Sequence, residues 1–490
     1  MNGHALGYVY GWALALFSLS ILPPLMLAIA EQETATLAGF LVTGLIASFI
    51  GVALMIALKQ QNSELNRREK ILTLIAVWLS YAALAAIPFE ASGILPSRLN
   101  AIFEATSALT TTGASTIKDI SLAPPSILLW RAELQWIGGF LTLLTITVLL
   151  LRIWGAERAE QEIATTTRQG ATTIHQLFAT IKLILPIYLG LTALFILALL
   201  MCGIPMFEAT SLVLTTISTG GMIPRDSHLL TYGSTALLFI LSLAMFFGAV
   251  SILWTHYLFS KNWNGLKKFS EPIWVAATIG GLAVCTLWLK YNFDQGREVK
   301  SFVTELAVSL FDAASLISTT GLTASAHSFQ LLSPSLILIF MLVGGGVIST
   351  AGGIKFTRIR LMVRQSWGEL RSLIYPNEVR PLYLSKEEKD HKYLSTVWVI
   401  FGLSILTLVV LASILAYTGL GLEAALFTSV SALVNCGPCL TAVEHQHTIG
   451  AWAFEDLAKS AKIALISAMF IGRLEFLVAL SLFQVTFWRH

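Results

Sequence analysis

The sequence predicts an all-α integral membrane protein with four pseudo-repeats around one central pore and two extra spans at the N-terminus. Three observations carry this prediction. The 490-residue chain is 56% hydrophobic and only 12% charged, about half the charged fraction of a soluble protein. Ten apolar stretches are long enough to cross a bilayer. Four shorter apolar segments, separated by roughly a hundred residues, each end in a turn of similar composition.

The ten long stretches are interpreted as membrane spans because each reaches about 18 residues or more. They are expected at 8–30, 35–58, 71–89, 125–153, 173–201, 234–259, 272–290, 334–364, 394–417 and 461–488. No Lys or Arg precedes the first of them, and it is too long for a signal-peptide core, so we expect it to be retained. Residues 1–70 then form a helix pair outside the repeats.

The four short apolar segments lie between paired spans, at 99–111, 206–217, 304–318 and 421–434. Each is too short to cross about 30 Å of hydrocarbon as a helix, and each is too apolar to be a solvated loop. Such segments are predicted to be re-entrant half-helices, which membranes tolerate only where they are buried in protein or line a cavity.

The distribution of basic residues predicts the orientation. With the N-terminus inside, 20 of the 31 Lys and Arg residues fall in cytoplasmic segments and 9 in outer segments. Basic residues concentrate on the cytoplasmic side of membrane proteins. Both termini are therefore expected in the cytoplasm, and the four half-helices are expected on the outer face.

An internal repeat is visible in the letters. Phe103-Glu104-Ala105-Thr106-Ser107 recurs in similar form at 207–211 and 311–315, with a spacing of 104 residues both times. A fourth copy, Phe427-Thr428-Ser429, lacks the acid. The predicted pore repeats are 71–153, 172–259, 272–366 and 393–490, with a cytoplasmic linker at 367–392.

The turns after the half-helices carry the predicted chemistry. They are Thr111-Thr112-Gly113, Ser218-Thr219-Gly220, Thr319-Thr320-Gly321 and Asn435-Cys436-Gly437. Four such turns facing one axis would present a ring of backbone carbonyls, which can replace the hydration shell of a potassium ion. Glycine reaches the positive φ values that this backbone needs, and the C-terminal dipoles of the half-helices favour a cation. The alternative is that glycine and threonine only allow close helix packing.

Further motifs carry a resemblance to a known family. They include Leu129-Trp130-Arg131, Gln135-Trp136-Ile137-Gly138-Gly139, Ser349-Thr350-Ala351-Gly352-Gly353-Ile354-Lys355, Tyr375-Pro376-Asn377 and Gly472-Arg473-Leu474-Glu475. With the four turns, they make the chain resemble the TrkH/TrkG/KtrB superfamily of potassium uptake proteins, and the TrkH branch in particular.

The resemblance implies potassium uptake across a bacterial inner membrane, with one pore per chain. It also implies a homodimer and a cytosolic ring of nucleotide-binding, TrkA-like regulatory subunits. Potassium is then the substrate at the filter, and no cofactor, structural metal or enzymatic activity is expected in this chain. Membrane lipid surrounds the protein, and the sequence has no basic stripe that would indicate nucleic acid.

A glycine-rich segment interrupts the last span of the third repeat. Gly344, Gly345, Gly346, Gly352 and Gly353 fall within ten residues, and each costs a helix about 1 kcal/mol relative to alanine. Inside a membrane, such a segment must line a cavity. We expect residues 344–353, with Ser349, Thr350 and Lys355, to form a gate below the filter. A phosphate-binding loop is the alternative, but the Gly-Lys-Ser/Thr ending is absent.

Arg473 and Lys182 are basic residues within predicted spans. Arg473 is well inside the last one, where a charge is expensive and usually functional. The resemblance places it near the gate, where a cation would repel ions; the alternative is that it pairs with Glu475 or caps carbonyls. Lys182 lies nearer the cytoplasmic end of its span and is expected to reach the interface with its long side chain.

Two cysteines flank the fourth turn. Cys436-Gly437-Pro438-Cys439 spells the thioredoxin motif, but that motif requires a soluble βαβ context, whereas here it follows a membrane half-helix. Adding His445 and His447 gives a zinc-like spacing, yet a metal there would block the filter. We therefore expect two free thiols, with the turn resisting a disulfide between them.

Four functions compete on this evidence. The first is potassium conduction, and the second is a sodium-coupled or sodium-permeable relative. The third, proton-coupled potassium symport, needs a relay of buried carboxylates, of which the central spans show few. The fourth, a membrane thiol oxidoreductase, depends on the cysteine pair alone.

Overall fold

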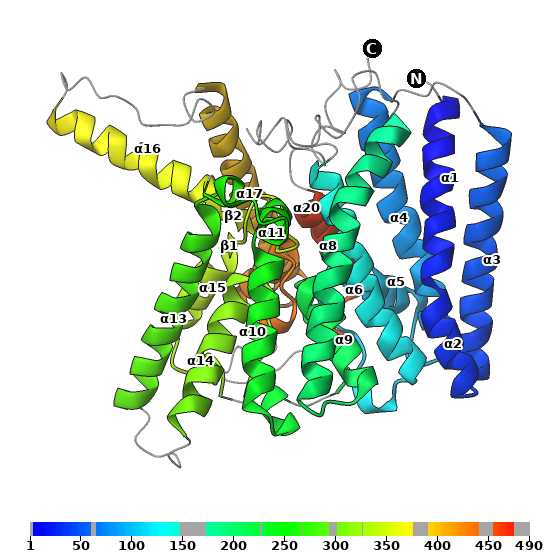
Figure 1. Cartoon of the computed structure of the whole chain (residues 1–490), viewed down its shortest axis with the longest axis horizontal. Coiled ribbons are helices and arrows are strands. Elements are labelled where there is room, and N and C mark those ends of the chain that lie inside the picture. Colours follow the sequence, from blue (N-terminus) through cyan, green and yellow to red (C-terminus); the bar gives the residue numbers. More distant parts are fainter. Residues whose placement is uncertain are drawn as a thin grey trace.

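The computed structural model is a bundle of long helices, approximately parallel in the view of Figure 1, with shorter helices embedded among them. It describes residues 3–59, 65–147, 173–225, 228–267, 269–293, 301–325, 327–375, 391–440 and 454–474. The extra N-terminal helices α1 (Gly3–Ser20), α2 (Leu22–Ala30) and α3 (Thr34–Ala57) lie at one end of the bundle. Small residues bring α1 and α3 together, because a Cβ on Gly11 would lie 2.9 Å from the Gly51 carbonyl oxygen.

The order span, half-helix, turn, span occurs four times along the chain. The leading spans are α4 (Arg67–Ala91), α8 (Thr173–Met201), α13 (Glu271–Phe293) and α17 (His391–Tyr417). The half-helices are α5 (Arg98–Leu109), α9 (Met206–Ile217), α14 (Phe302–Ile317) and α18 (Leu422–Val434). The closing spans begin with α6 (Pro125–Thr145), α10 (Thr235–Ala249), α15 (Pro334–Leu342) and α20 (Lys459–Leu474). The four predicted half-helices are thus confirmed to within two residues at each end.

Two of the ten predicted spans, 234–259 and 334–364, are sharply interrupted in the structure, and two others extend beyond its described part. Seven helices among the described residues are long and apolar enough to cross a membrane, or eight if one bent pair is counted. That pair, α10 and α11 (Ile252–Phe259), meets at 110°, so 234–259 is not one straight span. The ends of the spans predicted at 125–153 and 461–488 lie outside the described residues.

The span predicted at 334–364 is interrupted, as its glycine-rich segment led us to expect, because α15 ends at Leu342. Two short parallel strands follow, β1 (Val343–Gly344) and β2 (Ile354–Lys355), and they pair with each other. The chain between them forms the expected glycine-rich loop. The loop also explains the bend between α10 and α11: Gly346 N–H donates to the Ala249 carbonyl at 2.7 Å, and Ile252 N–H donates to the Ile348 carbonyl at 2.8 Å.

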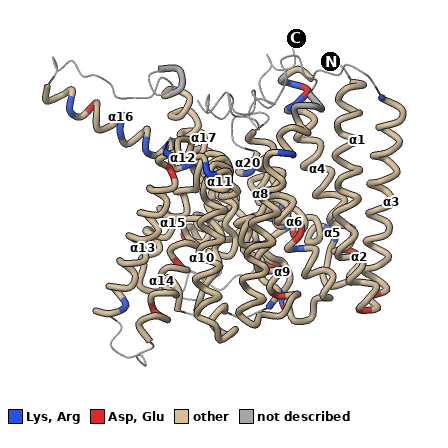
Figure 2. The backbone as a smooth tube through the Cα atoms, in the orientation of Figure 1, with Lys and Arg blue, Asp and Glu red and all other residues tan. Residues whose placement is uncertain are grey.

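After the strands, α16 (Phe356–Ile374) projects sideways from the bundle (Figure 1). Basic residues recur along it, as Figure 2 shows in blue, and Arg360, Arg364 and Arg371 are among them. Trp367, Leu370 and Leu373 are exposed on the same helix. A helix with basic and apolar faces suits the membrane–water interface. Short elements complete the fold: 3₁₀ turns at Ile120–Leu122 and Leu229–Tyr232, and α12 (Trp263–Leu266).

The half-helices lie in the core of the protein. Phe103, Phe311 and Phe427, which the repeated letters align, are all essentially inaccessible to solvent. They belong to one large cluster of buried apolar residues that extends through the repeats. A second cluster joins α1, α2 and α3 to the first repeat around Trp78 and Trp130. This packing fixes the ends of the half-helices, and therefore the turns that follow them.

Candidate functional site

The four turns share one backbone conformation. Each contains a non-glycine residue in the left-handed region: Thr111, Thr219, Thr319 and Asn435 have φ of 55°, 57°, 60° and 57°. In each, the next residue donates its N–H to the carbonyl five positions earlier, at 2.8, 2.8, 3.0 and 2.9 Å for Thr112, Gly220, Thr320 and Cys436. This pattern caps the C-terminus of a helix as in a Schellman motif. The four half-helices therefore end in equivalent turns.

The equivalence corrects the alignment of the second turn. Gly113, Gly221 and Gly321 each have φ of 79°, and Gly437 takes the corresponding place in the fourth turn. Gly220, which was predicted to match Gly113, corresponds instead to Thr112 and Thr320. The capping hydrogen bonds define this register, and the run Ser218-Thr219-Gly220-Gly221 also matches Ser318-Thr319-Thr320-Gly321 in it. Gly221 therefore joins the predicted site residues, and Gly220 remains one of them.

The turns contact one another in a closed ring. A Cβ on Gly113 would lie 2.0 Å from the Gly220 carbonyl oxygen, and one on Gly221 would lie 2.1 Å from the Thr320 carbonyl oxygen. In the same way, a Cβ on Gly321 would lie 2.7 Å from the Cys439 backbone nitrogen, and one on Gly437 would lie 2.3 Å from the Ala114 backbone nitrogen. Gly437 N–H also donates to the Thr112 carbonyl. The ring therefore runs through repeats one, two, three, four and back to one, with no room for a side chain at these glycines.

Buried acids hold the chain that leaves two of the turns. Glu104 accepts a hydrogen bond from Thr116 N–H at 2.8 Å, and Asp312 accepts one from Ala324 N–H at 3.2 Å. Each acid lies seven residues before the left-handed residue of its turn. Glu208 lies eleven before Thr219, one helical turn further away, and pairs with Arg225 instead. The repeated motif at 103–107, 207–211 and 311–315 recurs every 104 residues, but the turns that follow it therefore do not.

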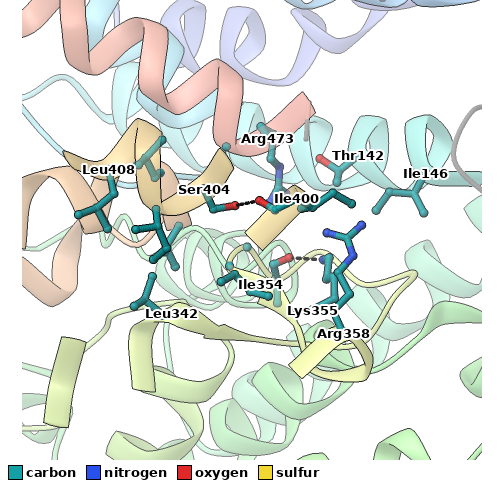
Figure 3. A pocket seen from close by; sticks show the side chains of 17 residues that line it. Thr142, Ile146, Leu342, Ile354, Lys355, Arg358, Ile400, Ser404, Leu408 and Arg473 are labelled. Carbon is teal, nitrogen blue, oxygen red and sulfur yellow. Dashed lines mark hydrogen bonds between the residues drawn. The ribbon is translucent and has the colours of Figure 1, made fainter. Parts of the chain in front are cut away.

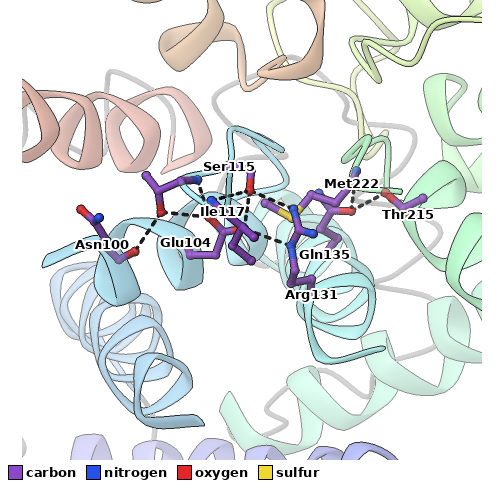
Figure 4. A network of polar contacts seen from close by, with 9 residues as sticks. Asn100, Glu104, Ser115, Ile117, Arg131, Gln135, Thr215 and Met222 are labelled. Atoms are coloured by element: carbon purple, nitrogen blue, oxygen red, sulfur yellow. Dashed lines mark hydrogen bonds and ion pairs between the residues drawn. The ribbon is translucent and has the colours of Figure 1, made fainter. Parts of the chain in front are cut away.

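Two residues of α6 brace the first and second turns (Figure 4). Arg131 Nε lies 3.0 Å from Glu104 Oε1, and both side chains are almost completely buried. Gln135, one helical turn later, accepts hydrogen bonds from Met222 N–H, at 3.3 Å, and from the Thr215 hydroxyl. A Cβ on Gly220 would lie 2.4 Å from Gln135 Cδ. This contact explains why the second turn has glycine where the first and third have threonine.

Glu104→Gln is expected to destabilise the protein strongly. The substitution leaves Arg131 buried without its counter-charge, which typically costs about 3–5 kcal/mol. Thermal unfolding of the purified protein in detergent measures the effect. Glu90→Gln is the matched control, because the Glu90–Arg98 pair is 3.6 Å apart and largely exposed, and exposed pairs contribute about 0–1 kcal/mol. Equal melting temperatures for the two variants would contradict a structural role for the buried pair.

The glycine-rich loop crosses beneath the turns. Thr350 Oγ1 lies 2.9 Å from the carbonyl oxygens of Ile217 and Gly248, to which its hydroxyl can donate. Gly352 N–H donates to Thr319 Oγ1 at 2.8 Å, and a Cβ on Gly352 would lie 1.8 Å from the Val434 carbonyl oxygen. The loop therefore touches the ends of the half-helices of repeats two, three and four.

Arg473 lies beside this loop, as expected. Its Nη1 donates to the Thr350 carbonyl at 2.8 Å, and its buried Nε and Nη2 have no hydrogen-bond partner among the described residues. Lys355 Nζ donates to the Ala351 carbonyl at 2.7 Å. Arg473, Lys355 and Arg358 line a cavity of about 50 Å³ at the loop (Figure 3). Glu475, the alternative partner of Arg473, lies outside the described residues, and Lys182 is exposed on α8.

Two supports of this region were not predicted from the sequence. Glu271 Oε1 accepts a hydrogen bond from Val347 N–H at 2.8 Å and so ties the loop to the start of α13. Glycines of three closing spans leave room for the ends of the half-helices. A Cβ on Gly138 would lie 1.7 Å from the Leu109 carbonyl oxygen, one on Gly248 would lie 2.8 Å from that of Ile217, and one on Gly472 would lie 2.1 Å from that of Leu433. Each of these carbonyls precedes the left-handed residue by two positions. The recurrence of glycine at matched places in three closing spans is the sequence signal that could have predicted this packing.

Cys436 and Cys439 are both buried free thiols. Cys436 Sγ donates a hydrogen bond to Cys439 Sγ at 2.7 Å. The two thiols are therefore free, as expected, although the turn brings their sulfurs close together. The chain folds back at this point because Asn435 is left-handed and Leu440 N–H bonds to the Gly437 carbonyl. No metal-binding group of three or more His, Cys, Asp or Glu occurs in the described part; His445 and His447 lie outside it.

Comparisons with known proteins agree on one family. The family model for TrkH, described as a cation transport protein, matches residues 38–262 and 270–487. The Trk system potassium uptake protein TrkH of Salmonella typhimurium is 30% identical over the full length of both chains. TrkG of Escherichia coli K12 is 26% identical, covering 98% of each chain. The crystal structure of the potassium transporter TrkH from Vibrio parahaemolyticus matches with a TM-score of 0.86, at 27% identity and with complete coverage of both chains.

Proposed function

The chain belongs to the TrkH family of cation transport proteins, and we propose that it takes up potassium ions through a single pore at the centre of its four repeats. The closed ring of four equivalent turns is the observation that carries this proposal. The names of the relatives, potassium uptake proteins and a potassium transporter, support the choice of ion.

The selectivity filter is proposed to consist of the four turns. Its residues are Thr111, Thr112, Gly113, Ser218, Thr219, Gly220, Gly221, Thr319, Thr320, Gly321, Asn435, Cys436 and Gly437. Their neutral carbonyls suit a weakly hydrated monovalent cation, and the C-terminal ends of the four half-helices add negative potential. Glu104 and Asp312 are engaged by backbone N–H groups behind the turns, so they position the filter without forming an acidic ring.

The gate is proposed to consist of the loop 344–353 with Lys355 and Arg473. The loop lies against the ends of three half-helices, and this contact supports a position in the path of an ion leaving the filter. Arg473 holds the Thr350 carbonyl and brings a positive charge to that path. A cation leaving the filter therefore meets both a steric and an electrostatic barrier.

Partners and location follow from the family. We propose a homodimer in the bacterial inner membrane, with both termini cytoplasmic and a TrkA-like nucleotide-binding ring on the cytoplasmic side. The relatives are named as components of a Trk system, which supports a multi-subunit assembly. The predicted docking segment, residues 355–392, begins with the basic helix α16; residues 376–390 lie outside the described part.

One observation favours a second candidate, proton-coupled symport. Glu133 on α6 has a buried Oε2 with no hydrogen-bond partner within the described ranges. A carboxyl of this kind inside a membrane span is a place where a proton could bind. Uniport through the carbonyl ring remains the function proposed here, because a single acid does not make a relay across the bilayer.

Flux of potassium and sodium into liposomes containing the purified protein tests the proposal. Potassium flux is expected to exceed sodium flux and to depend only on the electrochemical gradient of potassium. Equal fluxes of the two ions would overturn the assignment of selectivity. A pH gradient that drives potassium uphill in the parent, but not in Glu133→Gln, would replace uniport by symport.

A further inference from the structure

We propose that Cys436 and Cys439 form a redox-sensitive modification site, at which a two-electron thiol oxidant creates an intrachain disulfide and lowers ion flux. The effect on flux rests on the proposed potassium pathway, whereas the formation of the disulfide does not. The proposal concerns two side chains that the filter and gate leave without a role.

The geometry places the two thiols in position to react. Their sulfurs are joined by a hydrogen bond of 2.7 Å, and neither side chain is exposed to solvent. The S–S bond of a disulfide is about 2.05 Å long. The two sulfurs already lie 2.7 Å apart, so bond formation requires only a small further approach.

Both cysteines are coupled to the ring of turns. Cys436 N–H donates to the Ser431 carbonyl at 2.9 Å, and the Ser431 hydroxyl donates to the Cys436 carbonyl at 3.0 Å. The Cβ position of Gly321 lies 3.2 Å from Cys436 Sγ and 2.7 Å from the Cys439 backbone nitrogen. Drawing the sulfurs to bonding distance therefore moves atoms that abut the third turn, within a ring that has no free space at its glycines.

The reaction balances with an azo oxidant such as diamide. The thiolate of one cysteine adds to the N=N bond, and the thiolate of the other displaces the resulting hydrazide and forms the S–S bond. Two electrons and two protons pass from the cysteines to the oxidant, which leaves as a hydrazine. Attack by a thiolate is the chemistry by which disulfides form generally. In the proposed orientation, this turn faces the outer, oxidising compartment.

The other two cysteines must be removed so that the test reports on the proposed pair alone. Cys202 is half-buried near the end of α8, and Cys285 is exposed on α13; neither has a sulfur partner among residues with described positions. Substituting both by serine removes intermolecular disulfides and leaves only the proposed pair. Neither residue belongs to the proposed filter or gate.

The experiment treats the Cys202→Ser/Cys285→Ser protein in liposomes with diamide. Mass spectrometry of the peptide that contains Cys436 and Cys439, after alkylation, should show the loss of two hydrogens and no alkyl groups. Potassium flux should fall to a small fraction of its starting value and recover on addition of dithiothreitol. Adding Cys439→Ser to this background should abolish both changes, with each variant compared to its own flux before treatment.

Each outcome decides a separate part of the proposal. Two alkylated cysteines after treatment, under conditions that oxidise the same pair in denatured protein, would overturn the modification site. A disulfide without loss of flux would overturn the coupling to the pore. Absence of potassium flux before any treatment would contradict the proposed function instead, and the mass measurement would still decide the chemistry.

Discussion

Replacing Gly113 with serine is expected to lower the ratio of potassium to sodium flux by about tenfold. Gly113 has φ of 79°, a conformation that costs a residue with a side chain roughly 1–2 kcal/mol. The new Cβ would lie 2.0 Å from the Gly220 carbonyl oxygen and 2.9 Å from Pro438 Cδ. The carbonyl must therefore move, and a loss of about 1.4 kcal/mol in preference for one ion is a factor of ten.

Paired flux measurements in liposomes, with potassium and with sodium, determine this ratio. Gly203→Ser is the matched control, because Gly203 has φ of 81° and no heavy atom within 4 Å of its Cβ position. The control imposes the same backbone strain far from the ring and should leave the ratio unchanged. If Gly113→Ser folds, conducts and keeps the parent ratio, Gly113 does not line the filter.

The half-helices were predictable from sequence because their signal is local. An apolar segment too short to cross the bilayer and followed by a turn has few other structures available in a membrane. The prediction for 206–217 coincides with α9, and that for 421–434 begins one residue before α18. The ring of turns followed from the fourfold repeat of such segments.

The register of the second turn could not be obtained in the same way. The letters of the repeat place Phe207 beside Phe103 and Phe311, yet Phe207 is only half-buried whereas the other two are fully buried. The hydrogen bond from Gly220 N–H to the Thr215 carbonyl sets the register of this turn. The letters of the half-helix do not follow that register, whereas those of the turn, Ser218-Thr219-Gly220-Gly221 beside Ser318-Thr319-Thr320-Gly321, do.

The bend between α10 and α11 shows a second limit. Residues 234–259 form one apolar stretch, and nothing local interrupts it at Val250 and Ser251. The break depends on hydrogen bonds to residues of the loop almost one hundred positions later. Glu271 was missed for the same reason, because its partner Val347 lies 76 residues away. Contacts between residues far apart in the sequence thus determine these features.

Replacing Gly345–Gly352 with two glycines is expected to raise basal potassium flux by roughly a hundredfold. Three contacts hold the loop below the turns: those of the Thr350 hydroxyl, of Gly352 N–H and of Arg473 with the Thr350 carbonyl. At about 1 kcal/mol each, their loss shifts the equilibrium between closed and open pores by about 3 kcal/mol, or roughly a hundredfold. Flux into liposomes without any cytosolic partner measures the change.

The short link is compatible with the fold because the ends of the loop are neighbours. Gly344 pairs with Lys355 in the small parallel sheet, and its Cβ position lies 3.0 Å from the Gly353 carbonyl carbon. Thr350→Val serves as the graded control, since it removes only the hydroxyl contacts and should raise flux by a smaller factor. A shortened protein that folds, keeps its preference for potassium and conducts no faster than the parent would show that the barrier lies elsewhere, with Arg473 the next residue to examine. An increase in flux accompanied by lost selectivity would instead mean that the loop supports the turns above it, because Gly352 contacts both Thr319 and Val434.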